Sequence, residues 1–375
     1  MNDDALIRQL QSVTQLPGPH VSLYLNTEAE RELGPQEMEG RWRNLRDQVD
    51  GGTVPDKALL LLDDVVDGSH RKGDGLVAIT SGEEIRFRRF LGSPVPDSIS
   101  VGALPHLLPL FDHRQGHPTY GIVLIDRTGA EIHVVDDLSD EEVIEVEGDH
   151  DELRKVQPGG WSQRRFQNRA DDSWERNAEK VADRLARIIH AEGLELVIVM
   201  GDVRAKALLL DNAAPDIQPI LHELDTAPPT TDQLDVVRAE VEAAVAALVG
   251  RTVDATIERF LEERGQEDLA ADGIEATFAA LRMSQVETLL MTAEGIDHEA
   301  WFVSSDPTQG ATGRSALEDL GAADIGSAPT EDVLVRMALG TGAALCVIPP
   351  LSWDRGPKQG VGAILRYRTE SKPQA

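Results

Sequence analysis

The chain has 375 residues, of which 41% are hydrophobic, and its 66 acidic against 36 basic residues give a net charge of −30. At ~100–200 residues per domain, this length predicts two or three domains rather than one. The strong negative charge excludes a uniformly basic protein that coats nucleic acid, and it argues against binding to anionic membranes. Any contact with nucleic acid must therefore be local.

Membrane insertion and secretion are not expected from this sequence. No stretch approaches the ~18–20 continuous apolar residues that span a bilayer. The first residues, Met1-Asn2-Asp3-Asp4, lack the basic and apolar regions of a signal peptide. We therefore expect a cytoplasmic protein that has no membrane partner.

Metal and cofactor sites are not indicated either. Cys346 is the only cysteine and lies in an apolar run, so we expect a small core residue rather than a disulfide or a thiolate zinc site. His106, His113 and His117 are numerous enough for a metal site, but Pro109, Gly116 and Pro118 should break any helix that would align them. The sequence thus predicts no metal and no cofactor.

Residues 1–117 predict an α/β or α+β domain. Apolar periodicity places helices near Asp4–Gln15, Gln36–Val49 and Asp56–Val66, and strands at Val21–Leu25, Gly75–Thr80 and Ile85–Leu91. Prolines cluster where this pattern ends, and we place the domain boundary in the segment Asp112–Pro118.

Residues 118–226 predict a compact α/β domain. A hairpin is expected from Tyr120–Asp126 and Ala130–Val135, joined by a turn at Arg127-Thr-Gly129. Apolar residues at spacings of three and four predict a long helix over Arg164–Ala191, which a buried strand at Leu194–Met200 follows. Thr226-Ala-Pro-Pro229 is expected to be a linker.

Residues 227–375 alternate helical and strand patterns, which is typical of an α/β/α sandwich. We expect a long acidic helix over Thr231–Arg264 and shorter helices at Ile274–Arg282 and Glu331–Leu339. The expected strands are Val286–Met291, Trp301–Ser304, Ala344–Ile348 and Ala363–Tyr367. The fold class is therefore α/β, with three domains.

The most informative feature is a reversal of charge in the middle domain. Residues 136–152 hold ten acidic residues and neither lysine nor arginine, and we expect them to form a solvated hairpin rim. Residues 154–169 hold no acid and five basic residues, which are Arg154, Lys155, Arg164, Arg165 and Arg169. In a chain of this charge, the basic window is the best candidate for contact with RNA.

A glycine loop, residues 158–163, lies inside the basic window. Because Gly159 and Gly160 lose much backbone entropy on ordering, the loop should become fixed only when a partner holds it. Arginine forks and the amides of a helix N-terminus suit phosphate groups. Spacing alone leaves a second interpretation open, an ordinary turn whose arginines pair with the neighbouring acids.

The sequence Gly159-Gly-Trp-Ser-Gln-Arg-Arg-Phe166 resembles the GGQ loop of the archaeo-eukaryotic release-factor and Pelota superfamily. The Tyr120–Asp126 strand with the Gly129 turn is similar to the hairpin in the middle domain of that family. Residues 273–281, 286–290 and 360–367 resemble its third domain, and residues 1–117 resemble its N domain only loosely. The similarity is strongest to the bacterial branch, which includes actinobacterial relatives and the hibernation factor Balon.

The glycine loop departs from the family pattern at its catalytic position. Counted back from Phe166, the glutamine of the family falls at Trp161, and Gln163 stands two residues later. Gln163 could orient a water molecule against the ester of peptidyl-tRNA, as in GxxQ-type hydrolases, whereas Trp161 could stack on a base for ~1–3 kcal/mol. The loop could also be a non-catalytic contact with ribosomal RNA or a purely structural element.

The resemblance implies a factor that binds ribosomal RNA in the ribosomal A site and acts in hibernation or rescue, delivered by an EF-Tu-type translational GTPase. Residues 1–117 contain neither the NIKS tetrapeptide nor the cysteine-containing motif of the family, so we expect no reading of stop codons. Two alternatives stay open, a peptidyl-tRNA hydrolase that uses Gln163 and a stress-related interaction protein that does not bind ribosomes.

Overall fold

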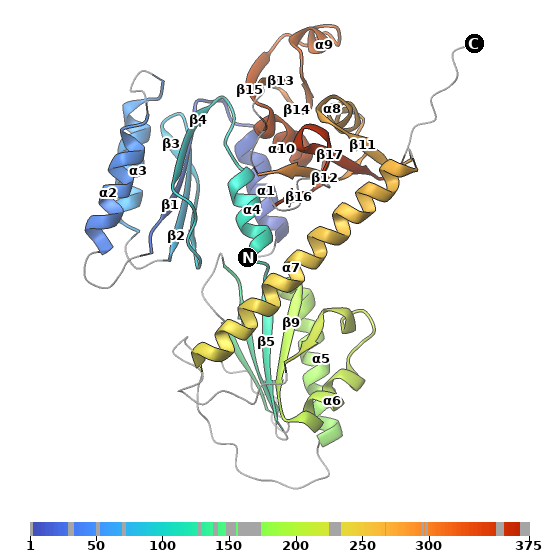
Figure 1. Cartoon of the computed structure of the whole chain (residues 1–375). Coiled ribbons are helices and arrows are strands. Elements are labelled where there is room, and N and C mark those ends of the chain that lie inside the picture. The colour runs from blue at the N-terminus through green and yellow to red at the C-terminus, as the bar shows by residue number, and fades with distance from the viewer. Residues whose placement is uncertain are drawn as a thin grey trace. The chain divides into compact units, whose positions relative to one another are not determined.

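The computed structural model describes residues 3–28, 34–49, 53–69, 73–126, 129–137, 142–147, 155–156, 174–224, 234–266, 268–293, 296, 299–349 and 356–367. They form a mixed α/β protein with several sheets (Figure 1). The chain divides into two compact units. Unit 1 contains residues 1–3 and 116–249, and unit 2 contains residues 4–115 and 250–375. No described helix is both long and apolar enough to span a membrane.

Unit 1 is built on a six-stranded sheet whose strands lie in the order β10-β9-β5-β6-β7-β8. β5, β9 and β10 run parallel, and each of the other neighbouring pairs is antiparallel. The predicted hairpin is confirmed as β5 and β6, and the predicted buried strand is β9. The strands are β5 (Tyr120–Ile125), β6 (Gly129–Val135), β7 (Glu142–Glu147), β8 (Lys155–Val156), β9 (Leu196–Gly201) and β10 (Leu221–Glu223).

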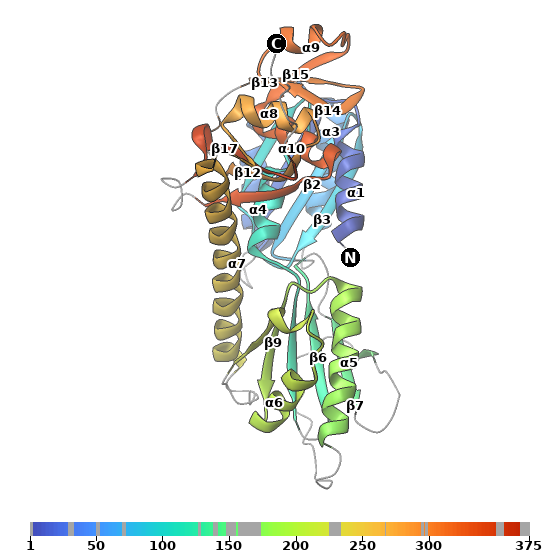
Figure 2. The same cartoon turned by 90° about the vertical axis from the view of Figure 1, so that its right-hand side faces the viewer.

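Both faces of this sheet are covered because its central strands are apolar on both sides. Val123 and Val199 face α5 (Trp174–Glu192) and α6 (Val203–Asn212), which lie together on one face (Figures 1 and 2). Ile122 and Ile198 pack against Val241 from the first part of α7 (Leu234–Gly265). A 3-10 turn, η2 (Gln218–Ile220), leads into β10.

The first part of unit 2 contains a four-stranded antiparallel sheet of order β3-β2-β1-β4. Helices α2 and α3 cover one face through Trp42, Leu45 and Leu62. The three predicted helices and three predicted strands of this segment are confirmed, whereas β4 was not predicted. The elements are α1 (Asp3–Thr14), β1 (His20–Asn26), α2 (Gly34–Arg46), α3 (Asp56–Asp67), β2 (Gly75–Ser81), β3 (Glu84–Leu91) and β4 (Ser98–Gly102).

A further helix, α4 (Leu108–Gly116), forms where we predicted that none could. The prediction was wrong because it treated every proline as a helix breaker. Pro109 stands in the first turn, where a backbone N–H has no partner within the helix and a proline ring is tolerated. Gly116 is the last residue of the helix, and Pro118 lies beyond it.

The last part of unit 2 contains a sheet of order β11-β17-β12-β16. The second part of α7 covers one face, where Ile257 and Phe260 pack against Leu290, and the buried Cys346 belongs to this core as predicted. Helices α8 and α10 contact strands of the same sheet. The elements are β11 (Ala270–Asp272), α8 (Ile274–Arg282), β12 (Val286–Thr292), α10 (Thr330–Thr341), β16 (Ala344–Ile348), η5 (Lys358–Gly360) and β17 (Val361–Leu365).

A separate three-stranded antiparallel sheet of order β14-β13-β15 lies between α8 and α10 in sequence. Only its central strand was predicted. Trp301 of that strand packs with Leu317 of the short helix α9. The elements are β13 (Glu299–Val303), β14 (Asp306–Ala311), α9 (Arg314–Glu318) and β15 (Ile325–Pro329).

Candidate functional site

Most of the residues predicted to form the site lie outside the described part of the chain. For Lys155 the structure gives the backbone, in β8, and not the side chain. The predicted RNA contacts and the predicted catalytic glutamine therefore stay predictions. The residues outside the described ranges are Arg154, Gly159, Gly160, Trp161, Gln163, Arg164, Arg165 and Arg169.

The structure does show the elements to which the two ends of this segment are attached. At one end, β8 pairs antiparallel with β7, with Lys155 opposite Ile144 and Val156 opposite Val143. β7 in turn pairs with the whole of β6. The basic window therefore begins on the outermost strand of the sheet.

β7 lies within the acidic run and was not predicted as a strand, whereas the predicted exposure of the run to solvent stays a prediction. Residues 142–147 of that run form a strand that hydrogen-bonds to neighbours on both sides. The reason lies in Val143, Ile144 and Val146, because β-branched residues favour the pleated conformation even when glutamates stand between them. Net charge dominated the prediction, and the strand pattern within it was overlooked.

At the other end, the segment leads into α5, which begins at Trp174. Val181, Leu185 and Ile188 are buried against the sheet, at the spacing of an amphipathic helix. The helix ends at Glu192 and is followed by Gly193, whose φ of 68° suits glycine and whose N–H donates to the carbonyl of Ile189. The predicted helix is confirmed over residues 174–191, and its predicted start at Arg164 lies outside the described residues.

The hairpin turn of β5 and β6 lies near the start of α5, and a close backbone contact supports it. Gly201, at the end of β9, has a φ of 133°, and a Cβ atom there would clash with the carbonyl oxygen of Ile125. Only glycine fits this position. The Asp202 N–H donates to the same oxygen at 3.0 Å, and the Asp126 carboxylate accepts from the Gly129 N–H at 3.2 Å.

A crevice between this turn and the start of α5 is lined by residues that include Asp126, Asn177 and Ala178. Its volume is about 10 Å³, which is room for one water molecule at most. A substrate therefore does not fit in it. If the adjoining segment carries chemistry, its ligand must bind at the surface rather than in this crevice.

Lys206 is a buried lysine that was not singled out from the sequence, because a lysine on a helix is usually exposed. It is 2% exposed, and its ammonium group donates to the Leu224 carbonyl at 3.0 Å and pairs with Glu223 at 3.2 Å. The ammonium therefore links α6 to the end of β10 through a hydrogen bond and an ion pair. Both partners belong to the scaffold of unit 1, so the role we assign is structural.

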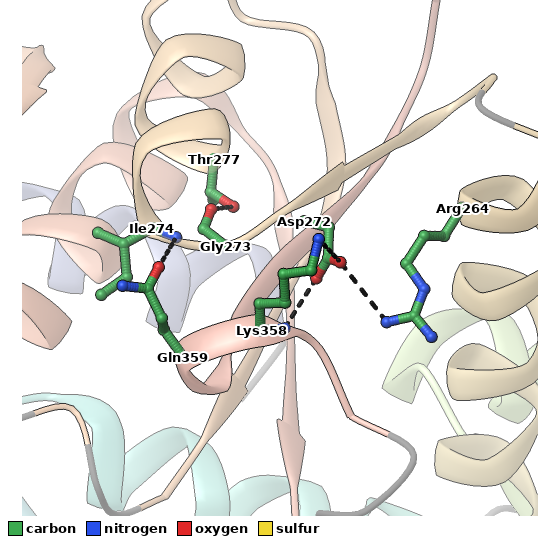
Figure 3. A network of polar contacts seen from close by, with 7 residues as sticks. All are labelled: Arg264, Asp272, Gly273, Ile274, Thr277, Lys358 and Gln359. Carbon is green, nitrogen blue, oxygen red and sulfur yellow. Dashed lines mark hydrogen bonds and ion pairs between the residues drawn. The ribbon is translucent and has the colours of Figure 1, made fainter.

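A polar network in unit 2 joins the end of α7, the start of α8 and η5 (Figure 3). The Asp272 carboxylate lies 3.5 Å from the Arg264 guanidinium and 3.4 Å from the Lys358 ammonium, and it accepts from the Lys358 N–H at 2.8 Å. The Gln359 side chain accepts from the Ile274 N–H at 3.3 Å and so caps α8.

An open depression beside this network is lined by Glu275 and Glu299 as well as Asp272. Asp272 is already paired with two cations, and the N-terminus of α8 is already capped. The network therefore stabilises a junction of three elements.

Comparison with known proteins finds a family similar to the part of the chain that contains the glycine loop. Residues 119–266 match the model of bacterial archaeo-eukaryotic release factor family 2. The protein Rv2629 of Mycobacterium tuberculosis (strain H37Rv) is 27% identical over 378 residues, which cover 97% of each chain. The similarity to Rv2629 thus extends well beyond the matched segment.

Solved structures show weaker likeness. A model of ribosome-bound archaeal Pelota with ABCE1 is 14% identical, covers 98% of this chain and 94% of its own, and has a TM-score of 0.44. Dom34 of S. cerevisiae, a translation termination-like factor that interacts with Hbs1, is 13% identical over 67% and 64% of the two chains, with a TM-score of 0.40.

The family match confirms the predicted resemblance to the release-factor superfamily. The matched residues include the hairpin, the basic window and the helix from which this resemblance was predicted. Residues 119–266 are therefore similar to bacterial archaeo-eukaryotic release factor family 2, which is the bacterial branch that the sequence analysis predicted.

Proposed function

We propose that the protein is a ribosome-associated translation factor that binds in the A site and acts in hibernation or rescue of ribosomes. The observation that carries this proposal is the family match over residues 119–266. The basic window lies within the matched segment, although the chain as a whole carries a net charge of −30. A local basic surface on an acidic protein favours contact with one site of a polyanion over coating of nucleic acid.

In this proposal, each of the three parts of the chain makes a different contact. Residues 118–226 would present the glycine loop to ribosomal RNA, through Gly159, Gly160 and Trp161 and the basic residues of the window. Residues 1–117 would occupy the decoding site without reading codons. Residues 227–375, which we propose to be an α/β/α sandwich, would contact an EF-Tu-type translational GTPase in the cytoplasm.

Co-sedimentation with ribosomes tests the proposal. Replacement of Arg164, Arg165 and Arg169 by glutamate should weaken binding because it removes three phosphate partners and adds three negative charges. Wild-type binding should fall with salt by roughly 0.7–0.9 log units per log unit of salt for each phosphate contacted.

A matched control keeps the same change of charge within unit 1. Lys180, Arg187 and Arg204 are exposed residues of α5 and α6 outside the window. Their replacement by glutamate should reduce binding much less than the change in the window. Equal effects of the two triple variants would mean that net charge alone governs binding, and no binding by wild type would favour an interaction protein that does not engage ribosomes.

A second candidate function is hydrolysis of peptidyl-tRNA, which the position of Gln163 two residues after Trp161 favours. An amide can donate to and accept from a water molecule, whereas an indole can only donate. In that case Gln163→Ala should lower single-turnover release by ~10²-fold or more and leave binding intact. In the hibernation or rescue function that we prefer, wild type shows no release above background, and Trp161→Ala weakens binding instead.

A further inference from the structure

The two parts of unit 2, residues 4–115 and 250–367, are joined by hydrogen bonds between residues far apart in sequence. The Gln115 amide donates to the Val347 carbonyl at 2.7 Å and accepts from the Val347 N–H at 2.9 Å, on the edge strand β16. The Gln11 amide donates to the carbonyl of Leu339 at 2.8 Å. None of these groups titrates near neutral pH.

One contact between the two parts does titrate. His106 Nδ1 lies 2.8 Å from Asp332 Oδ1, where Asp332 stands in the first turn of α10. The Asp332 side chain is 2% exposed and that of His106 is 23% exposed. The backbone of His106 is fixed to β1, because its N–H donates to Ser22 Oγ and its carbonyl accepts from the Tyr24 hydroxyl.

The groups that act on this pair are Glu331 and Asp332 of α10 and Tyr24 of β1. Burial lowers the pKa of His106, but the hydrogen bond and charge of Asp332, together with the charge of Glu331, outweigh it and raise the pKa above its ordinary value. Burial raises the pKa of Asp332, and His106 offsets this only in part. Burial and the Asp332 charge also raise the pKa of Tyr24.

We propose that the His106–Asp332 pair is a proton-dependent latch between the two parts of unit 2, closed while the pair holds a proton and weakened when that proton leaves. A buried carboxylate is stable beside an imidazolium. Beside a neutral imidazole it becomes an unpaired buried charge, which favours opening of the contact to water. The uncharged contacts at Gln115 and Gln11 belong to the same junction and should open more often when the latch is weakened.

Both shifts give the latch the same dependence on pH. The pKa of His106 is raised in the folded protein, so its stabilisation is complete below the unfolded value of ~6.5 and is lost as pH rises through the folded value. The pKa of Asp332 is also raised, so its proton too is held more tightly in the folded state. The latch therefore weakens as the solution becomes more alkaline.

Hydrogen exchange at the Val347 amide measures opening directly, because this N–H donates to Gln115 across the contact. We expect its protection factor, corrected for the intrinsic effect of pH on exchange, to fall by about tenfold from pH 6 to pH 9. The amide of Met291 in the central strand β12 serves as reference, and its protection should not change in parallel.

Two variants separate the latch from a general effect of pH. In the double variant His106→Gln with Asp332→Asn, two neutral amides replace the pair, and the extra fall in protection at Val347 should disappear. His190→Gln, which changes an exposed histidine of α5, should keep the wild-type behaviour. An unchanged fall in the double variant would overturn the proposal.

The wild-type protein gives a second test if the double variant does not fold. The titration of the His106 imidazole, followed by NMR, should have the same midpoint as the loss of protection at Val347. A midpoint that differs by more than one pH unit, or protection that does not vary with pH, would also overturn the proposal.

Discussion

Arg336 of α10 should be among the residues of unit 2 most sensitive to substitution. It is 1% exposed, and its guanidinium donates to three backbone carbonyls. These are Thr14 at the end of α1, Asp306 and Ser304, at 3.1, 3.1 and 3.0 Å. Its Cζ atom also lies 5.1 Å from the ring centroid of Phe302. Burial lowers the pKa of Arg336 to about 10, so the side chain is still a cation at neutral pH.

We expect Arg336→Met to lower the free energy of unfolding by about 3–5 kcal/mol. Each hydrogen bond from a charged donor contributes ~1.5–3 kcal/mol, and three carbonyls lose their donor together. The loss is less than the sum because methionine fills much of the space and removes the cost of burying a cation. Arg336→Lys keeps the charge but not the planar fork, so we expect an intermediate loss.

Urea unfolding measures the change in the free energy of unfolding. Faster hydrogen exchange in β13 and α10 would show that the lost stability belongs to unit 2. The matched control is Arg314→Met, because Arg314 also stacks on an aromatic ring, at 5.5 Å from Trp301, but is 50% exposed and paired with Glu318. An exposed pair of this kind should cost about 1 kcal/mol or less. Equal losses in the two variants would refute the assignment of a buried structural role to Arg336.

Three further predictions concern single residues. Gly201→Ala should destabilise unit 1 by more than ~2 kcal/mol, whereas Gly193→Ala, which has a positive φ but open space around it, should cost only about 1–2 kcal/mol; urea unfolding compares them. Lys206→Met should cost about 1–2 kcal/mol in the same assay, because the Leu224 carbonyl loses its donor. Burial raises the pKa of Cys346 to about 11, so iodoacetamide at pH 8 should modify the folded protein roughly 100-fold more slowly than the urea-unfolded chain; comparable rates would contradict this.

The parts of the fold that the sequence predicted are those with a strong local pattern. The hairpin of β2 and β3 and the helix α3 follow from runs of alternating or helically spaced apolar residues. β4, β14 and β15 were missed because their sequences are rich in small or polar residues, as in Asp306–Ala311 and Ile325–Pro329. Such strands are held by pairing with neighbours rather than by intrinsic preference.

Contacts between distant segments could not be predicted at all. The joining of residues 4–115 with residues 250–375 in one unit depends on single partners such as His106 and Asp332, which are 226 positions apart. No periodicity marks such a pair. For the candidate site, the motif and the family resemblance could be read from the sequence, and the structure adds the strand β8 and the helix α5 between which the motif lies in the chain.

The attachment of the basic window bears on the kind of partner that the proposed function requires. Lys155 of the window pairs with Ile144 of β7, a strand that contains Glu142, Glu145 and Glu147. Neighbouring strands lie ~4.8 Å apart, less than the Debye length of ~8 Å at physiological salt, so salt does not screen charges on these two strands from one another. A small anion gains little from such a mixed field, whereas a polyanion that contacts several arginines at once can outweigh the glutamates. This favours an extended phosphate surface, such as ribosomal RNA, over a free nucleotide as the partner of the window.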